Sequence, residues 1–166
     1  MRIEIFFEHD EPVAIPIQYN HIFQALIYSW IGDEEYSKFL HNRGFQYEDK
    51  VYKLFTFSRL HGQFKVDKKL GKFIFYKDMR ITISSIVDDF IRHLLNNILL
   101  VNSSLNIGGA TVRISKIEVK EKPKFSKKMR VYTLSPCTVY TTTDNKQTRY
   151  FNPFDREFSE YIKNNL

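Results

Sequence analysis

The sequence predicts an α+β fold, because segments with the period of a strand are interspersed with segments that have the period of a helix. Residues 2–8 and 110–120 alternate between apolar and polar side chains, as strands with one buried face do. Residues 20–31 and 86–100 instead repeat apolar side chains every three or four positions, which places them on one helix face. Shorter strand-like segments lie between the two helices, at residues 53–61, 72–76 and 80–84.

This order of elements, βαββαβ through residue 122, is that of a ferredoxin-like (RRM-like) domain. The first helix is expected to begin near Asn20, a residue type that caps helices well. A short second helix is expected to begin after Asp33 and to stop at Gly44. The third has a capping box, Ser85 to Asp88, at its start.

Two segments of the first domain and one beyond it have the composition of connections. Residues 9–19 contain Pro12 and Pro16 and are expected to be a loop, and residues 61–71 a basic, turn-rich linker. Residues 123–130 are expected to be a basic linker between domains. Residues 131–166 then predict a strand, a hairpin (139–143 with 148–151) and a helix after Pro153. Because this unit has too few strands for a core of its own, we expect the beginning of a second, incomplete ferredoxin-like domain.

Composition and charge exclude several classes of protein. The chain has 166 residues and a net charge of +6, and residues 112–130, with eight bases and two acids, carry that excess. A local basic block points to an anionic partner. The single cysteine, Cys137, excludes a disulfide framework and a cysteine-based zinc site. The chain has no glycine-rich phosphate loop, no apolar run of membrane-spanning length and no signal-peptide pattern, which predicts a soluble cytoplasmic protein without a membrane partner.

Three proton-active side chains lie away from the predicted core. On the helical wheel, Tyr28 falls far from the apolar stripe of the first helix and His41 far from that of the second. Lys53 stands at the entry to the next strand. Each alone is commonly a solvated surface residue, but the three would converge if the helices fold back against the strand.

Four segments of the sequence are similar to those of a known protein family. The segments QALIYSW (24–30), YSKFLH (36–41), YKLFTFS (52–58) and TLSP (133–136) resemble the CRISPR repeat-RNA endoribonucleases of the RAMP superfamily. The resemblance covers nearly the whole chain. It implies two ferredoxin-like domains and cleavage of CRISPR repeat RNA without a metal or other cofactor.

The resemblance also implies catalytic roles for Tyr28, His41 and Lys53. In this chemistry the RNA 2′-OH attacks its own 3′ phosphate and leaves a 2′,3′-cyclic phosphate and a 5′-OH. It requires a base, an acid and a cation to offset phosphorane charge. We expect His41 to serve as acid or base, Tyr28 to orient the 2′-OH or act as base, and Lys53 to stabilise the transition state. DNA is not expected as a substrate because it lacks the 2′-OH.

The chain departs from this family in one respect. Members normally end in a glycine-rich loop that supports RNA binding, whereas the last glycine here is Gly109. We therefore expect an N-terminal fragment without much of the RNA platform. Its exposed strand edges would favour a homodimer or a partner in a ribonucleoprotein complex.

Two basic clusters are candidates for RNA binding. The first consists of Lys120, Lys122, Lys124, Lys127, Lys128 and Arg130, with a solvated interdomain linker as the alternative. The second, Lys65, Lys68, Lys69 and Lys72, is more typical of a solvated loop. No metal site is predicted, because His9, Asp10 and Glu11 are contiguous and their side chains diverge. The competing functions are a non-cleaving RNA-binding module and a structural subunit of a CRISPR ribonucleoprotein.

Overall fold

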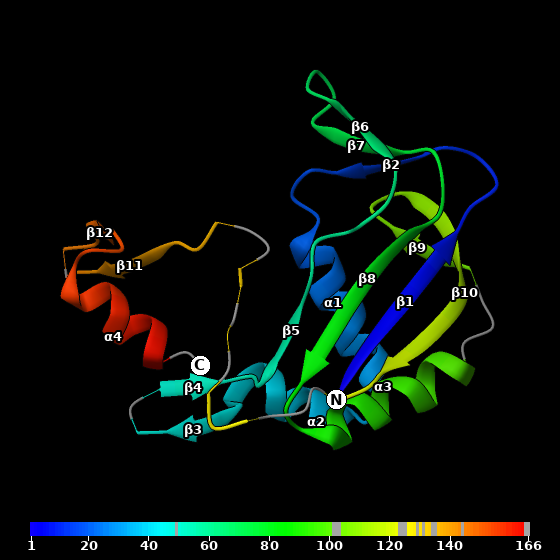
Figure 1. Ribbon diagram of the computed structural model, residues 1–166. Coiled ribbons are helices and arrows are strands. Elements are labelled where there is room, and N and C mark those ends of the chain that lie inside the picture. The colour runs from blue at the N-terminus through cyan, green and yellow to red at the C-terminus, as the bar shows by residue number, and fades with distance from the viewer. Residues whose placement is uncertain are drawn as a thin grey trace. The chain divides into compact units, whose positions relative to one another are not determined.

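The alternating segments at the two ends of the predicted first domain pair with each other in the computed structural model (Figure 1). The chain divides into two units, Met1–Pro123 and Lys124–Leu166. The structure describes residues 1–48, 50–100, 104–122, 126–128, 130, 132–133, 136–143 and 145–164.

A five-stranded antiparallel sheet carries the first unit. Its order is β5-β8-β1-β10-β9, and its strands are β1 (Arg2–Glu8), β5 (Phe55–Phe57), β8 (Met79–Ser85), β9 (Leu105–Ile107) and β10 (Ala110–Lys120). In the register, Ile5 of β1 lies between Ile81 of β8 and Ile117 of β10. The predicted ferredoxin-like order of strands and helices is confirmed, with β9 as an additional edge strand.

Two helices, α1 (Asn20–Ile31) and α3 (Asp88–Leu100), cover one face of this sheet. Their apolar stripes are buried as predicted, including Phe23, Ile27 and Trp30 of α1 and Phe90 and Leu94 of α3. The Asn97 side chain of α3 donates a hydrogen bond to the carbonyl of Ile31 (2.8 Å). The other sheet face carries polar side chains such as Glu4, Arg80 and Glu118 together with Phe6.

The helix α1 begins at Asn20 as predicted, but its N-cap residue is Tyr19 rather than Asn20. Tyr19 is buried against Phe23 and Phe73, and its hydroxyl accepts a hydrogen bond from the Leu60 amide (2.9 Å). The buried Tyr19 ring therefore anchors the residue that precedes the first turn of α1.

The two segments of the first domain that were predicted as connections, residues 9–19 and 61–71, both contain strands. The small sheet β2-β7-β6 consists of β2 (Val13–Pro16), β6 (Phe64–Asp67) and β7 (Lys72–Phe75). In it, Val13 and Ile15 lie opposite Phe75 and Phe73. This pairing joins segments far apart in the sequence, so neither short segment reveals it alone. The linker prediction for residues 61–71 was wrong because β6 gains its order from β7.

The segment predicted as one strand, 53–61, is also divided. A hairpin of β3 (Phe45–Tyr47) and β4 (Lys50–Tyr52) precedes β5. Leu54 has a φ of 56°, and this conformation separates β4 from β5. Lys53 is thus placed in a sharp connection rather than in a strand.

The second unit contains β11 (Val139–Thr142), β12 (Thr148–Phe151) and α4 (Arg156–Asn164). The hairpin and the helix agree with the prediction, and Phe151 packs against Tyr161 with ring centroids 5.6 Å apart. The strand predicted over 131–136 lies partly outside the described residues, and Tyr132, Thr133 and Pro136 have no regular structure. None of the helices in the described ranges combines the length and hydrophobicity needed for a membrane span.

Candidate active site

The three side chains singled out by the sequence come from three separate places in the first unit. Tyr28 lies near the end of α1, His41 in a π-helical turn, η1 (Phe39–Arg43), and Lys53 directly after β4. His41 is exposed, and Tyr28 and Lys53 are half-buried. All three are accessible to a molecule that docks on this unit.

The structure brings these three residues together. The Tyr28 and His41 rings meet edge to face, with centroids 5.4 Å apart and an interplanar angle of 71°. Lys53 Nζ donates a hydrogen bond to the backbone carbonyl of His41 (2.8 Å). His41 therefore contacts both of the other residues.

The π-helical turn determines the exposure of His41. The turn continues α2 (Glu34–Lys38). As predicted, Asp33 caps this helix, and its Oδ1 accepts a hydrogen bond from the Tyr36 amide (2.8 Å). Within η1, Leu40 is completely buried while the next residue, His41, is exposed. Turns of this kind are rare and occur frequently at functional sites. Burial of Leu40 anchors the turn and leaves the imidazole at the surface.

Gly44 ends this turn in close contact with the Lys53 segment. Its amide donates to the Phe39 carbonyl (2.7 Å), and its φ of 71° lies in the left-handed region. A Cβ at this position would lie 2.8 Å from the Tyr52 carbonyl oxygen and 3.3 Å from Lys53 Cδ. The absence of a side chain at Gly44 thus allows η1 to pack directly against the residues that position Lys53.

Tyr28 is held in a partly desolvated position. Its ring packs edge-on against Phe55 (5.8 Å), which stacks on Phe90 of α3 (4.7 Å). Burial raises the pKa of the Tyr28 phenol, and a hydrogen bond with Gln24 offsets part of that rise. A raised pKa keeps the phenol protonated at neutral pH, which favours hydrogen-bond donation over the role of base.

Asn42 is a candidate positioning residue that the sequence analysis did not single out. Its Oδ1 lies 2.9 Å from His41 Nδ1. Since an amide oxygen only accepts hydrogen bonds, this contact places a proton on Nδ1 and leaves Nε2 of neutral His41 free to accept one. A lone asparagine beside a histidine carries no sequence motif, so its role emerges only from the contact.

The first basic cluster is divided by its ion pairs. Lys120 Nζ lies 2.7 Å from Glu4 and 2.6 Å from Glu118, and Lys122 Nζ lies 2.7 Å from Asp88. RNA phosphates would therefore compete with these carboxylates for the two lysines. In the second unit, Lys127, Lys128 and Arg130 are exposed, and Lys124 lies outside the described residues. An RNA-binding role for the cluster stays a prediction.

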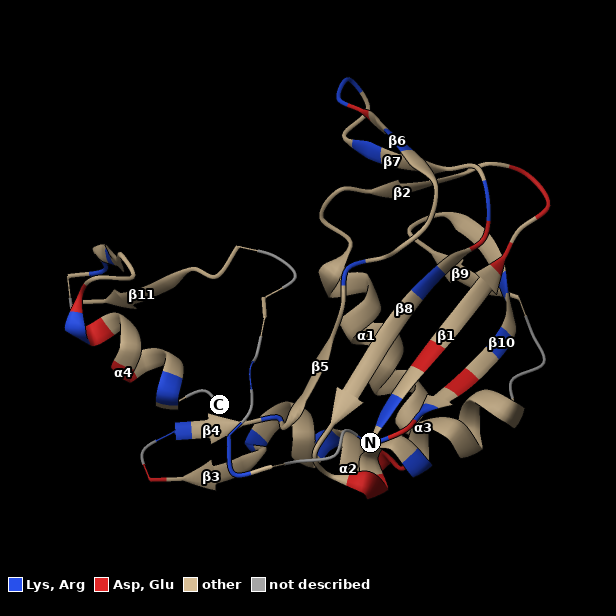
Figure 2. Ribbon diagram, in the orientation of Figure 1, with Lys and Arg blue, Asp and Glu red and all other residues tan. Residues whose placement is uncertain are grey.

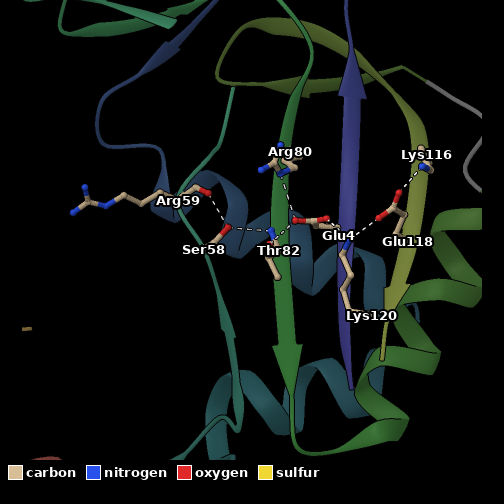
Figure 3. A network of polar contacts seen from close by, with 8 residues as sticks. All are labelled: Glu4, Ser58, Arg59, Arg80, Thr82, Lys116, Glu118 and Lys120. Carbon is tan, nitrogen blue, oxygen red and sulfur yellow. Dashed lines mark hydrogen bonds and ion pairs between the residues drawn. The ribbon is translucent and has the colours of Figure 1, made fainter. Parts of the chain in front are cut away.

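The open face of the main sheet carries a network of charges (Figure 3). Glu4 and Glu118 lie directly opposite each other on β1 and β10, a pairing that would be unfavourable alone. Lys120 bridges both carboxylates, Lys116 pairs with Glu118, and Arg80 pairs with Glu4 (3.4 Å). Hydrogen bonds from Lys116 and Lys120 lower the pKa of Glu118 to about 2.

This lowered pKa predicts an acid-dependent loss of stability. A carboxyl whose pKa is lower in the folded chain stabilises it above the ordinary value of 4.5, and the contribution disappears as pH falls toward about 2. Glu118→Gln should therefore melt at a lower temperature than the parent at neutral pH, with the difference vanishing near pH 2. Circular dichroism melts at several pH values measure this.

The control for this experiment is Glu121→Gln. Glu121 is exposed and has no ion pair within the described part of the chain. Its variant should follow the pH dependence of the parent. A melting difference for Glu118→Gln that stays constant with pH would contradict the assigned role of the carboxylate.

Metal-binding side chains do not gather near this site. Over the described ranges, no group of three or more His, Cys, Asp and Glu side chains is arranged to hold a metal ion. The metal independence expected from the sequence remains a prediction for experiment.

The strand order and the two helices on one face define the first unit as a ferredoxin-like domain. Residues 14–118 match the family described as "CRISPR-associated protein Cas6, N-terminal", and residues 119–166 match "CRISPR associated protein Cas6, C-terminal". The chain therefore belongs to the Cas6 family. This membership supports processing or binding of CRISPR repeat RNA.

Solved structures agree with this assignment. A structure described as "CRISPR associated protein Cas6" is 27% identical, with a TM-score of 0.67, over 99% of this chain and 67% of the other. A Cas6-related protein from Pyrococcus furiosus shows the same fold, with 23% identity and a TM-score of 0.73 over 99% of this chain and 67% of the other. A structure described as "An RAMP protein binding different RNA substrates" also has this fold. It is 24% identical, with a TM-score of 0.71 over 99% of this chain and 68% of the other. A comparison with curated proteins finds no significant match.

Proposed function

We propose that this chain is a metal-independent endoribonuclease that cleaves CRISPR repeat RNA at the Tyr28–His41–Lys53 group. The single observation that carries the proposal is the meeting of these side chains around His41, at 5.4 Å between rings and 2.8 Å from Lys53 Nζ to the His41 carbonyl. A phenol, an imidazole and an ammonium in one place supply the proton transfer and the positive charge that phosphodiester cleavage requires.

The proposed reaction is an internal transfer of the phosphoryl group. The 2′ oxygen of RNA forms a bond to the adjacent phosphorus, and the bond from phosphorus to the 5′ oxygen of the next nucleotide breaks. One proton leaves the 2′-OH and one reaches the departing 5′ oxygen. The products are a 2′,3′-cyclic phosphate and a 5′-OH, with no external reactant.

Each residue of the group has a distinct role in this proposal. Neutral His41 accepts the 2′ proton at Nε2, the nitrogen that its contact with Asn42 leaves free, or as imidazolium donates a proton to the leaving oxygen. Tyr28 donates a hydrogen bond that orients the reacting group, as its raised pKa favours. Lys53 offsets the charge of the phosphorane, and the basic residues between 120 and 130 hold flanking phosphates.

The proposal predicts cutting that requires the 2′-OH and tolerates EDTA. The purified chain is incubated in EDTA with a repeat-containing RNA and with the same RNA carrying one 2′-deoxy nucleotide at the cut position. We expect only the unmodified RNA to be cut there, because the substituted RNA lacks the attacking oxygen. Mass spectrometry of the products identifies the cyclic phosphate.

Two other results would overturn the proposal. Binding of both RNAs without cutting would favour the non-cleaving RNA-binding module. Cutting of the 2′-deoxy RNA at the same bond would exclude attack by the 2′ oxygen.

A further inference from the structure

A basic hairpin projects from the first unit, away from the candidate active site. It consists of residues 63–76, with β6 and β7 as its strands, and is called the arm below (Figure 1). In Figure 2 the ribbon of this hairpin is coloured for Lys or Arg at the tip and on both strands. The sequence predicts a solvated loop for its four lysines, whereas the structure places them on a hairpin.

Within the part of the chain that the structure describes, the arm lysines have no carboxylate partner, unlike the basic residues of the main sheet that form ion pairs. On the main sheet and beside it, Arg80, Arg113, Lys116, Lys120 and Lys122 all form ion pairs. By contrast, Lys65, Lys68, Lys69 and Lys72 form no ion pair with any residue that the structure describes. The nearby Asp67 carboxylate accepts hydrogen bonds from the Lys69 and Leu70 amides (3.0 and 2.9 Å) and so stabilises the turn. The positive charge of the arm lysines is therefore available to an anionic partner.

An exposed aromatic ring lies at the root of the arm on the same side as two of these lysines. By strand alternation, Lys65, Lys72 and Tyr76 share the face of the small sheet that turns away from the core. Lys65 Nζ lies 5.4 Å from the centroid of the Tyr76 ring, which is 46% exposed. Tyr76 also lines an open hollow of about 780 Å³ with His61, Gln63, Lys77 and Arg80.

We propose that the arm is a second RNA-binding element, in which the four lysines contact phosphates and Tyr76 stacks on a base. The identity of the ligand rests on the proposed function, and the combination of unpaired cations with an exposed ring supports it. Cationic side chains follow a nucleic-acid backbone, and aromatic rings stack on single-stranded bases whatever their sequence. An acidic protein would use the cations but would leave the ring and the hollow without a role.

The arm and the candidate active site lie at opposite ends of β8. The arm leads into Met79, the first residue of β8, whereas Ser85, the last, pairs with Phe55, which contacts the Tyr28 ring. Seven residues of extended strand span about 20 Å. RNA on the arm therefore lies outside the reacting nucleotides and adds affinity without taking part in the chemistry.

The test measures the salt dependence of RNA binding by the full chain. Each protein carries His41→Ala, so that RNA is not consumed. Two further variants change all four arm lysines, one to glutamine and one to arginine, and a third carries Tyr76→Ala. Fluorescence anisotropy with a labelled oligouridine of about 30 nucleotides gives the affinity between about 50 and 300 mM salt.

We expect the glutamine variant to reduce the slope of log affinity against log salt by about 2 to 3, since each phosphate contact on a single strand contributes about 0.7. Its affinity at about 100 mM salt should fall at least tenfold. The arginine variant keeps the charge and should match its parent. Tyr76→Ala removes no charge, so it should weaken binding with an unchanged slope.

Several results would overturn the arm proposal. These are an unchanged slope in the glutamine variant, an equal loss in the arginine variant, or no RNA binding by the parent. A separate RNA-cutting assay with His41 intact distinguishes failure of the arm proposal from failure of the proposed function. RNA binding that depends on the arm lysines, without RNA cutting, would refute only the proposed nuclease activity. RNA cutting together with binding that does not depend on the arm lysines would refute only the arm proposal.

Discussion

Replacing His41 by alanine is expected to lower the rate of RNA cutting by about 10²- to 10⁴-fold, the usual contribution of a general acid or base. The change removes the imidazole that packs against Tyr28 and keeps the backbone carbonyl to which Lys53 donates. RNA binding should persist, because the cations of the arm and of the second unit are untouched. Folding should also persist, because His41 is exposed and the turn is anchored by Leu40. Single-turnover cutting, RNA affinity and melting temperature measure the three effects.

His21→Ala is the matched control. His21 is also an exposed histidine and lies on α1, but outside the Tyr28–His41–Lys53 group. Its variant should cut at the parental rate. Equal cutting by the His41 and His21 variants would remove His41 from the mechanism.

Gly44→Ala is expected to lower both stability and cutting. The added Cβ would meet the Tyr52 carbonyl at 2.8 Å and Lys53 Cδ at 3.3 Å, so the Lys53 segment must move. The left-handed φ of 71° adds backbone strain, for a combined cost of about 1–3 kcal/mol in the free energy of unfolding. Cutting should fall by at least about tenfold, because the ammonium would no longer be held beside His41. Urea unfolding and single-turnover cutting measure the two effects.

Gly109→Ala separates strain from displacement. Gly109 also has a left-handed φ, of 94°, but a Cβ there meets nothing within 4 Å. Its variant should lose stability from strain alone and cut at the parental rate. If both glycine variants cut normally, close packing between Gly44 and the Lys53 segment is not needed for activity.

The elements that the sequence predicted well are those with a regular period and a buried face. The stripes of α1 and α3 and the alternation of β1 and β10 show which side of each element is apolar, and burial follows. The same reasoning placed Tyr28 and His41 off the core. His41 is exposed as predicted, whereas Tyr28 is half-buried and packs against the core beside Phe55. Local patterns therefore predicted most of the first domain, whereas the catalytic roles of Tyr28, His41 and Lys53 rest on the resemblance to a known family and stay a prediction.

The features that the sequence could not predict depend on pairings between distant segments. The short strand β2 is ordered by β7, and the loop prediction for residues 9–19 missed it for this reason. Lys120 was interpreted as a free cation, yet its partner Glu4 is on the opposite end of the first unit's sequence. The ion pair exists only because β1 and β10 are neighbours in the sheet, which no local window shows.

Trp30 makes the core of the first unit visible to fluorescence. It is the only tryptophan in the sequence, and it is buried in α1 with 3% of its surface exposed. Its emission therefore reports the unfolding of residues 1–123 and is silent about the second unit. A transition seen by circular dichroism without a change in tryptophan emission would belong to the second unit, so the two can be followed separately in one intact chain.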